Sequence, residues 1–227
     1  MIPADRLKGV QFMAKRSHGV GRPKAGTRPL DAENAILAAA LELFAARNYA
    51  SVRTADIAKA TGFNQALIFY YFDNKEELYQ RALTLAIERA FHTFRLSREN
   101  ISNPADLIFA WIDNHVRAYD SIAKLIKLSI DYVSTAERKT KIDRAIRSFY
   151  DDERDVLQTA LEAGIASGQF ADVDAARTAT FISTYLDGVF VRAMVLPDFR
   201  PVTAIQDLKT YVNDHLAKKR KAPSRAR

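Results

Sequence analysis

The chain has 227 residues, of which 48% are hydrophobic and 27% charged, and it contains no cysteine. This composition predicts a folded chain with a sizeable core, and it excludes wholesale disorder, disulfides, thiolate metal sites and cysteine nucleophiles. The net charge of +7 lies at the two ends, because residues 1–29 and 218–227 each carry +6 and the residues between them carry −5. Charge alone therefore does not locate a nucleic-acid interface.

Residues 1–29 are predicted to form a flexible basic arm, because they hold four of the eight glycines and three of the seven prolines and show no apolar period. The arm contains Gly21-Arg22-Pro23-Lys24, which is similar to motifs that lay an arginine in a narrow minor groove. Arg22 is therefore a candidate DNA contact, and a merely solvated leader is the alternative. The chain lacks an apolar run of about 18 residues and the pattern of a secretion signal, so we expect a cytoplasmic protein with no membrane partner.

From residue 31 onward, apolar residues recur at helical spacing and no alternating strand pattern is present, so the predicted fold class is all-α. A first helix is expected over residues 31–48, with Asp31 as its N-terminal cap and Asn48 in a left-handed conformation at its end. Two short helices are expected over 54–60 and 64–71. A long helix then begins at Asn74, with Glu77 as the capping-box partner, and runs to residue 97.

The second half is predicted to be helical as well. One helical stretch is expected from Pro104 through Val133, two long helices over 142–167 and 174–196, and a last helix over 202–216. The run Asp151-Asp152-Glu153 is interpreted as a solvated helix face. The predicted organisation is a basic arm over 1–29, a three-helix helix-turn-helix domain over 30–82, a helical ligand-binding and dimerisation domain over 83–217, and a disordered basic tail over 218–227.

Two short helices joined at Gly62, between longer helices, are typical of a helix-turn-helix DNA reader. Ile57, Ala58, Ile68 and Phe72 are expected to face inward. A Gln side chain can pair with adenine, Ala and Leu can touch thymine methyl groups, and Tyr hydroxyls and a Lys can reach phosphates. The alternative is a plain corner of a helical bundle, which three consecutive exposed aromatic residues would disfavour. The outward residues are expected to be Gln65, Ala66, Leu67, Phe69, Tyr70 and Tyr71, with Lys75 in the first turn of the next helix.

The stretch AILAAALELFAARNYASVRTADIAKATGFNQALIFYYFDNKEELYQRAL resembles the DNA-binding domain of the TetR family of repressors. The similarity lies in the AA and LF of the first helix, the IA pair, the turn glycine, the YYF end of the second short helix and the KEEL that follows. The resemblance implies that Gln65, Ala66 and Leu67 read bases. Residues implied to support them or to contact phosphates are Thr54, Phe69, Tyr70, Tyr71 and Lys75, and we add Arg53 and Asn64, which replace residues usual in the family.

For the second half, the resemblance implies a homodimer and a small-molecule inducer. Apolar stripes on the two long helices place Leu157, Leu161, Phe181, Tyr185 and Val189 at the predicted dimer interface. Ordinary intramolecular core is the alternative reading of these stripes. The candidate ligand pocket consists of aromatic residues that could equally be plain core: Trp111, His115, Tyr119, Tyr132, Tyr185 and Phe190. The four histidines are dispersed, so neither a metal site nor a cofactor is predicted.

These patterns predict a transcriptional regulator, most simply a repressor, that binds palindromic double-stranded operator DNA as a homodimer and is released by a small-molecule inducer. A DNA-binding adaptor controlled by a protein partner is the alternative. An enzyme is disfavoured, because the sequence shows no phosphate-binding glycine loop, no metal cluster and no nucleophile with a base at a recognisable spacing.

Overall fold

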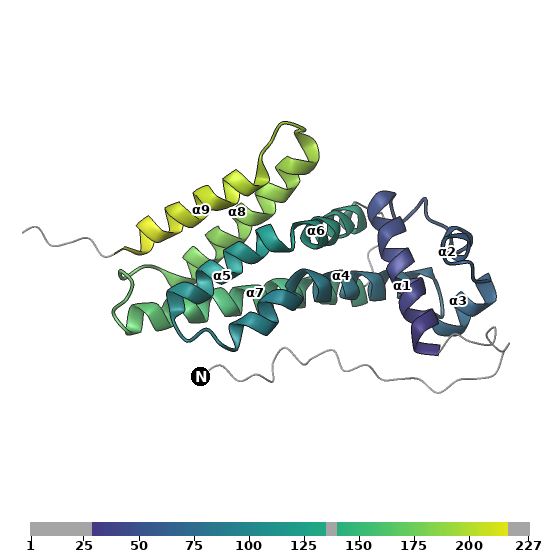
Figure 1. Cartoon of the computed structure of the whole chain (residues 1–227), viewed down its shortest axis with the longest axis horizontal. Helices are drawn as coiled ribbons and strands as arrows, with labels where there is room; N and C mark the ends of the chain where they lie inside the picture. The colour runs from purple at the N-terminus through teal and green to yellow at the C-terminus, as the bar shows by residue number, and fades with distance from the viewer. Residues whose placement is uncertain (1–28, 135–139, 218–227) are drawn as a thin grey trace, which may run out of the picture. The chain divides into compact units, whose positions relative to one another are not determined.

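The computed structural model describes residues 29–134 and 140–217 of the chain, and these residues form helices and no strands (Figure 1). The predicted all-α fold class is therefore confirmed. The chain divides into two compact units, Met1–Ala82 (unit 1) and Leu83–Arg227 (unit 2). In the described ranges, none of the helices is long and apolar enough to cross a membrane. The helices are α1 (Pro29–Ala46), α2 (Thr54–Thr61), α3 (Gln65–Tyr71), α4 (Lys75–Arg98), α5 (Pro104–Arg117), α6 (Tyr119–Val133), α7 (Thr140–Ala166), α8 (Ala175–Val195) and α9 (Pro201–Leu216).

Unit 1 consists of α1, α2, α3 and the first two turns of α4. Its core is formed by side chains that are at most 1% exposed, among them Phe44, Ile57, Phe72 and Tyr79. The Phe44 and Tyr79 rings meet edge to face, with centroids 4.9 Å apart, which ties α1 to α4. These contacts form the scaffold on which α3 is held.

The end of α1 differs from the prediction. The helix stops at Ala46, and no described residue other than glycine has a positive φ, so the left-handed conformation expected at Asn48 is wrong. The Asn48 side chain closes the turn instead, because its Oδ1 accepts the backbone N–H of Ser51 at 2.8 Å. The start is also shifted: α1 begins at Pro29, which places Asp31 in the first turn of the helix.

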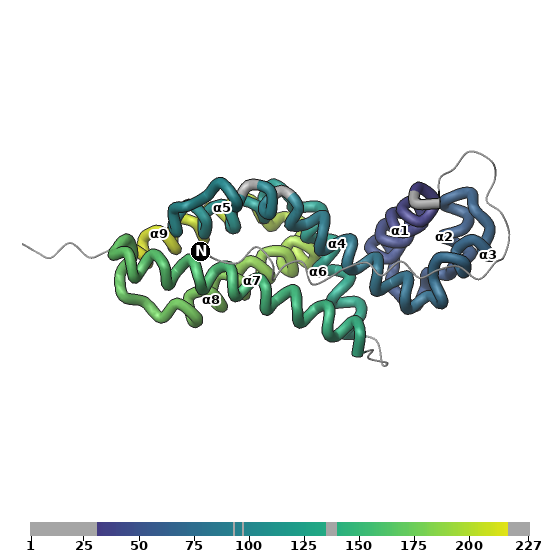
Figure 2. The backbone as a smooth tube through the Cα atoms, turned by 90° about the horizontal axis from the view of Figure 1, so that it is seen from below, coloured from purple at the N-terminus to yellow at the C-terminus, as the bar shows by residue number. Residues whose placement is uncertain are grey.

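Unit 2 contains the rest of α4 and helices α5 to α9. α7 packs against α5 and α8, and α8 packs against α9 (Figure 2). The single helical stretch expected from Pro104 through Val133 is corrected to two helices, α5 and α6, which meet at Ala118. Ala118 leaves the helical region with φ −103° and ψ 24°, and its N–H donates to the carbonyls of Asn114 and Val116. No glycine or proline marks this break in the sequence.

The end of α7 depends on the absence of a side chain at Gly164. A Cβ built at this position would overlap the ring of Phe170, which is 5% exposed and folds back onto the helix. We expect Gly164→Ala to destabilise the protein by about 1–3 kcal/mol, because overpacking outweighs the better helix propensity of alanine. Thermal unfolding followed by circular dichroism measures the effect. Ala163→Ser, at the exposed neighbouring position, is the control, and equal midpoints for both variants would contradict the close packing.

Candidate nucleic-acid interface

α3 is held by the turn that precedes it and by two anchors below it. Gly62 adopts φ 71°, the left-handed conformation that ends α2, as the sequence predicts. Asn64 caps α3, because its Oδ1 accepts the backbone N–H of Leu67 at 2.8 Å. Ile68 and Phe72 are each 1% exposed and fix the inner face of the helix. The short helix is therefore positioned by its cap and by packing rather than by its own length.

The outer face of α3 presents most of the residues predicted for it. Gln65 and Ala66 are exposed and Leu67 is half-buried. Phe69 is 50% exposed and Tyr70 42%, which is unusual for large aromatic side chains that serve no binding role. The outward placement of Tyr71 is wrong, because its hydroxyl is buried without a hydrogen-bond partner, and burial is the largest cause of its raised pKa.

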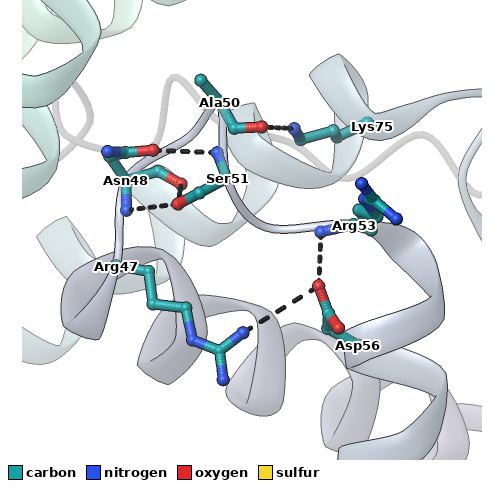
Figure 3. Close-up of polar contacts among 7 residues, drawn as sticks. All are labelled: Arg47, Asn48, Ala50, Ser51, Arg53, Asp56 and Lys75. Atoms are coloured by element: carbon teal, nitrogen blue, oxygen red, sulfur yellow. Dashed lines mark hydrogen bonds and ion pairs between the residues drawn. The ribbon is translucent and has the colours of Figure 1, made fainter.

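The start of α2 lies beside the loop that follows α1 (Figure 3). Arg53 is the N-terminal cap residue, but its side chain makes no cap hydrogen bond, and Asp56 Oδ2 accepts the Arg53 backbone N–H at 2.8 Å. Arg53 is exposed, and Thr54 is half-buried in the first turn of the helix. Free N–H groups at such a terminus suit a phosphate oxygen.

Lys75 begins α4 and reaches back to the same loop. Its Nζ lies 3.5 Å from the Ala50 carbonyl oxygen (Figure 3). The same Nζ lies 4.3 Å from the centroid of the Tyr49 ring. Asn74 caps α4 as predicted, with Oδ1 accepting the Glu77 N–H at 2.9 Å. The Glu77 carboxylate accepts the backbone N–H of Asp73, whereas a capping box requires it to accept the N–H of the cap residue Asn74.

One contact that stabilises the core of unit 1, on which α3 is held, was not predicted. Arg81 forms an ion pair with Glu33, which joins α4 to α1, and its guanidinium lies 4.9 Å from the centroid of the Phe72 ring. The two charged residues are 48 positions apart in the chain, so no local pattern could connect them. This contact covers the anchor at the end of α3.

The described part of unit 1 is not basic. Residues 29–82 carry five Lys or Arg and seven Asp or Glu, a net charge of −2. Arg22, predicted as a DNA contact, lies outside the described residues. The basic charge of unit 1 therefore belongs to residues 1–28, which carry +6.

In unit 2, four of the six residues predicted for a pocket lie in one aromatic cluster. Trp111 contacts His115 at 5.7 Å, His115 contacts Phe190 at 6.1 Å, and Phe190 stacks on Tyr119 at 4.9 Å between ring centroids. Burial lowers the pKa of His115 to about 4, so the ring is neutral at neutral pH. Tyr132 is buried elsewhere and its hydroxyl donates to Asp143 at 3.2 Å.

The predicted dimer interface divides into a buried and an exposed set. Leu157, Leu161 and Val189 are at most 3% exposed within one chain, so they form its core and their assignment to the interface is corrected. Phe181 and Tyr185 are exposed on α8, with centroids 6.2 Å apart. The assignment of Tyr185 to the pocket is corrected too, because its hydroxyl donates to the Ala204 carbonyl of α9.

The interpretation of Glu153 as part of a solvated face is wrong. The side chain is 4% exposed, and its Oε2 accepts the Ser183 hydroxyl at 2.6 Å. Burial raises the pKa of Glu153 to about 7. A signal was present in the sequence: Glu153 lies four and seven residues before Leu157 and Ala160, on the buried stripe of α7.

Models of known protein families match residues in both units. The model "Bacterial regulatory proteins, tetR family" matches residues 36–82, and "BetI-type transcriptional repressor, C-terminal" matches residues 115–217. The HTH-type transcriptional regulator TtgR of Pseudomonas putida is 26% identical over 207 residues, covering 83% of this chain and 91% of that protein. The HTH-type transcriptional repressor AcnR of Corynebacterium glutamicum is 26% identical over 189 residues, covering 81% and 93%.

Solved structures share the fold. A putative transcriptional regulator from Saccharomonospora viridis, crystallised in complex with choline, has a TM-score of 0.72 at 22% identity and covers 84% of this chain and all of its own. A TetR transcriptional regulator from Chloroflexus aurantiacus has a TM-score of 0.70 at 25% identity, covering 83% of this chain and 98% of its own. The shared features are the helix-turn-helix near the N-terminus and the helical C-terminal unit.

Proposed function

Because the chain belongs to the TetR family of DNA-binding transcriptional regulators, we propose that it is a repressor that binds a palindromic operator as a homodimer and leaves it when a small molecule binds unit 2. The exposed face of α3 carries this proposal. Gln65, Ala66 and Tyr70 extend from a helix whose inner face is anchored in the core. A helix of this kind fits the major groove of DNA. There a glutamine side chain can donate one hydrogen bond to an adenine and accept another from the same base.

The dimer is proposed to form through exposed aromatic residues of α8 and α9. Phe181 is 43% exposed and Tyr211 55%, and their ring centroids lie 5.4 Å apart, so the two helices present one apolar surface. Large exposed rings on adjacent helices favour burial against a second copy. Two reading helices about 34–36 Å apart, one turn of DNA, would then contact the two halves of an operator.

The inducer is proposed to bind among the aromatic residues of unit 2. The complex of the Saccharomonospora viridis protein with choline supports this idea, since it indicates that the fold can hold a small molecule. The protein leaves DNA if the small molecule binds more tightly to the conformation that does not fit DNA than to the one that does. The loss of DNA affinity can be no larger than the difference between these two affinities for the small molecule. An adaptor controlled by a protein partner would show no such linkage.

The proposal is tested with Gln65→Ala on duplexes that the full-length protein enriches from genomic fragments. We expect affinity to fall by about 1–3 kcal/mol, the worth of a bidentate base contact, whereas affinity for unrelated DNA stays the same. Fluorescence anisotropy at one fixed salt concentration measures both. Gln158→Ala, which removes an amide from α7, is the control. Equal losses on both kinds of DNA would show that Gln65 does not read a base.

A further inference from the structure

Lys75 is the first residue of α4, a position at which a positive charge is electrostatically unfavourable. The backbone N–H groups of a first helical turn carry positive partial charge, which favours acidic residues such as Glu76 and Glu77. The Lys75 ammonium group lies against the loop that follows α1, where two groups of negative character face it. These groups are the Ala50 carbonyl oxygen, 3.5 Å from Nζ, and the Tyr49 ring, whose centroid is 4.3 Å from Nζ.

The loop that presents these two groups is closed by its own hydrogen bonds (Figure 3). Asn48 Oδ1 accepts the Ser51 N–H at 2.8 Å, and the Ser51 hydroxyl donates to the Asn48 carbonyl at 3.2 Å. The Tyr49 ring meets the Tyr79 ring edge to face with centroids 4.9 Å apart, and the centroid of the Phe44 ring lies 6.0 Å away. Because Tyr79 and Phe44 are at most 1% exposed, the core of unit 1 holds the Tyr49 ring in place.

This arrangement brings the ammonium group to the loop that leads into α2 (Figure 3). Ala50 lies four residues before Thr54, the first residue of α2, and both Ala50 and Arg53 are exposed. The N–H groups at the start of a helix and an ammonium group nearby together suit a phosphate oxygen. Since an ammonium group has three N–H donors, contact with one carbonyl leaves it able to donate to a phosphate as well.

We propose that Tyr49 is a positioning residue for DNA binding, because the face of its ring holds the Lys75 ammonium group where it can contact a phosphate of the DNA backbone. This proposal rests on the function proposed above and adds to it a residue that touches no base. A lysine side chain that is already held loses less conformational freedom on binding than a free one does. The gain in affinity is therefore the same for operator and for unrelated DNA, since phosphate contacts carry no sequence information.

Two substitutions separate the ring face of Tyr49 from its hydroxyl. Fluorescence anisotropy at several salt concentrations measures binding of the full-length protein to enriched and to unrelated duplexes, at a temperature where circular dichroism shows every variant folded. We expect Tyr49→Leu to weaken binding to both kinds of DNA by about two- to fivefold, the worth of an exposed cation–π contact. Tyr49→Phe keeps the ring and should stay within about twofold of the wild type. Wild-type affinity of the leucine variant, or equal losses for both variants, would overturn the proposal.

Lys75→Gln shows whether the ring acts through the ammonium group. We expect this variant to reduce the magnitude of the salt slope of DNA binding by about 0.9, the worth of one phosphate contact. Lys127→Gln, which removes an exposed lysine from unit 2, is the control and should leave the slope unchanged. When Lys75→Gln is already present, Tyr49→Leu should cause no further loss of DNA affinity.

The outcomes separate this inference from the regulator function. A further two- to fivefold loss on adding Tyr49→Leu to Lys75→Gln would show that Tyr49 acts through packing alone, and it would overturn the proposal. DNA binding with the wild-type salt slope in the Lys75→Gln variant would refute this inference and leave the regulator function standing. A wild-type protein that binds no duplex would refute both.

Discussion

Phe72→Ala is expected to destabilise unit 1 by about 3–5 kcal/mol, the usual cost of removing a fully buried aromatic ring. The ring is 1% exposed, ends α3 and lies beneath the guanidinium of Arg81. Its removal would leave a cavity under the reading helix, so α3 would lose its position and operator binding would fall with stability. Thermal unfolding followed by circular dichroism measures the first effect and fluorescence anisotropy the second.

The matched control is Phe69→Ala on the outer face of the same helix. Phe69 is 50% exposed, so its removal should change stability by at most about 0.5 kcal/mol while it still weakens DNA binding. Trp111 fluorescence of both variants should stay that of the wild type, because Trp111 belongs to unit 2. If Phe72→Ala unfolds at the wild-type temperature, Phe72 does not anchor α3 and the account of the scaffold is wrong.

Removal of residues 1–28 is expected to weaken operator binding by a factor on the order of a hundred at low salt. The physical reason is charge: these residues carry +6, whereas residues 29–82 carry −2. The slope of log affinity against log salt concentration is negative. For every phosphate that the arm neutralises, the truncation should reduce the magnitude of this slope by about 0.9. The truncated chain begins at Pro29, the first residue of α1, so it keeps every described helix.

The sequence offers a control of equal charge. Removal of residues 218–227 also takes away +6, but from the far end of the chain, after α9. If the arm contacts DNA beside α3, its removal should reduce the magnitude of the salt slope more than removal of the tail does. Equal slopes for the two truncations would mean that the arm acts only through net charge.

The helix-turn-helix was predictable because its signals are local. Gly62 takes a positive φ and Asn64 caps a helix, and the residue type at each of these two nearby positions indicates its role. The inward positions of Ile57 and Ile68 follow from helical period in the same way. Short-range patterns of this kind need no knowledge of what packs against the helix.

Several failed predictions concern features that no local sequence pattern marks. Ala118 carries no breaking signal, so the division of α5 from α6 could not be read from the sequence. Tyr71 belongs to a run of three aromatic residues, and only the structure distinguishes its buried hydroxyl from the exposed ring of Tyr70. The partner of Glu153 is Ser183, 30 residues away on another helix. A run of acidic residues indicates a solvated face only until a neighbouring helix covers one of them.

Selection of bound sequences from random duplexes with the full-length protein shows whether two copies of α3 read two halves of one operator. We expect enriched DNA with two inverted half-sites whose centres lie about 10 base pairs, or a multiple of one helical turn, apart. Enrichment of a single unrepeated site, or no enrichment at modest salt, would contradict it.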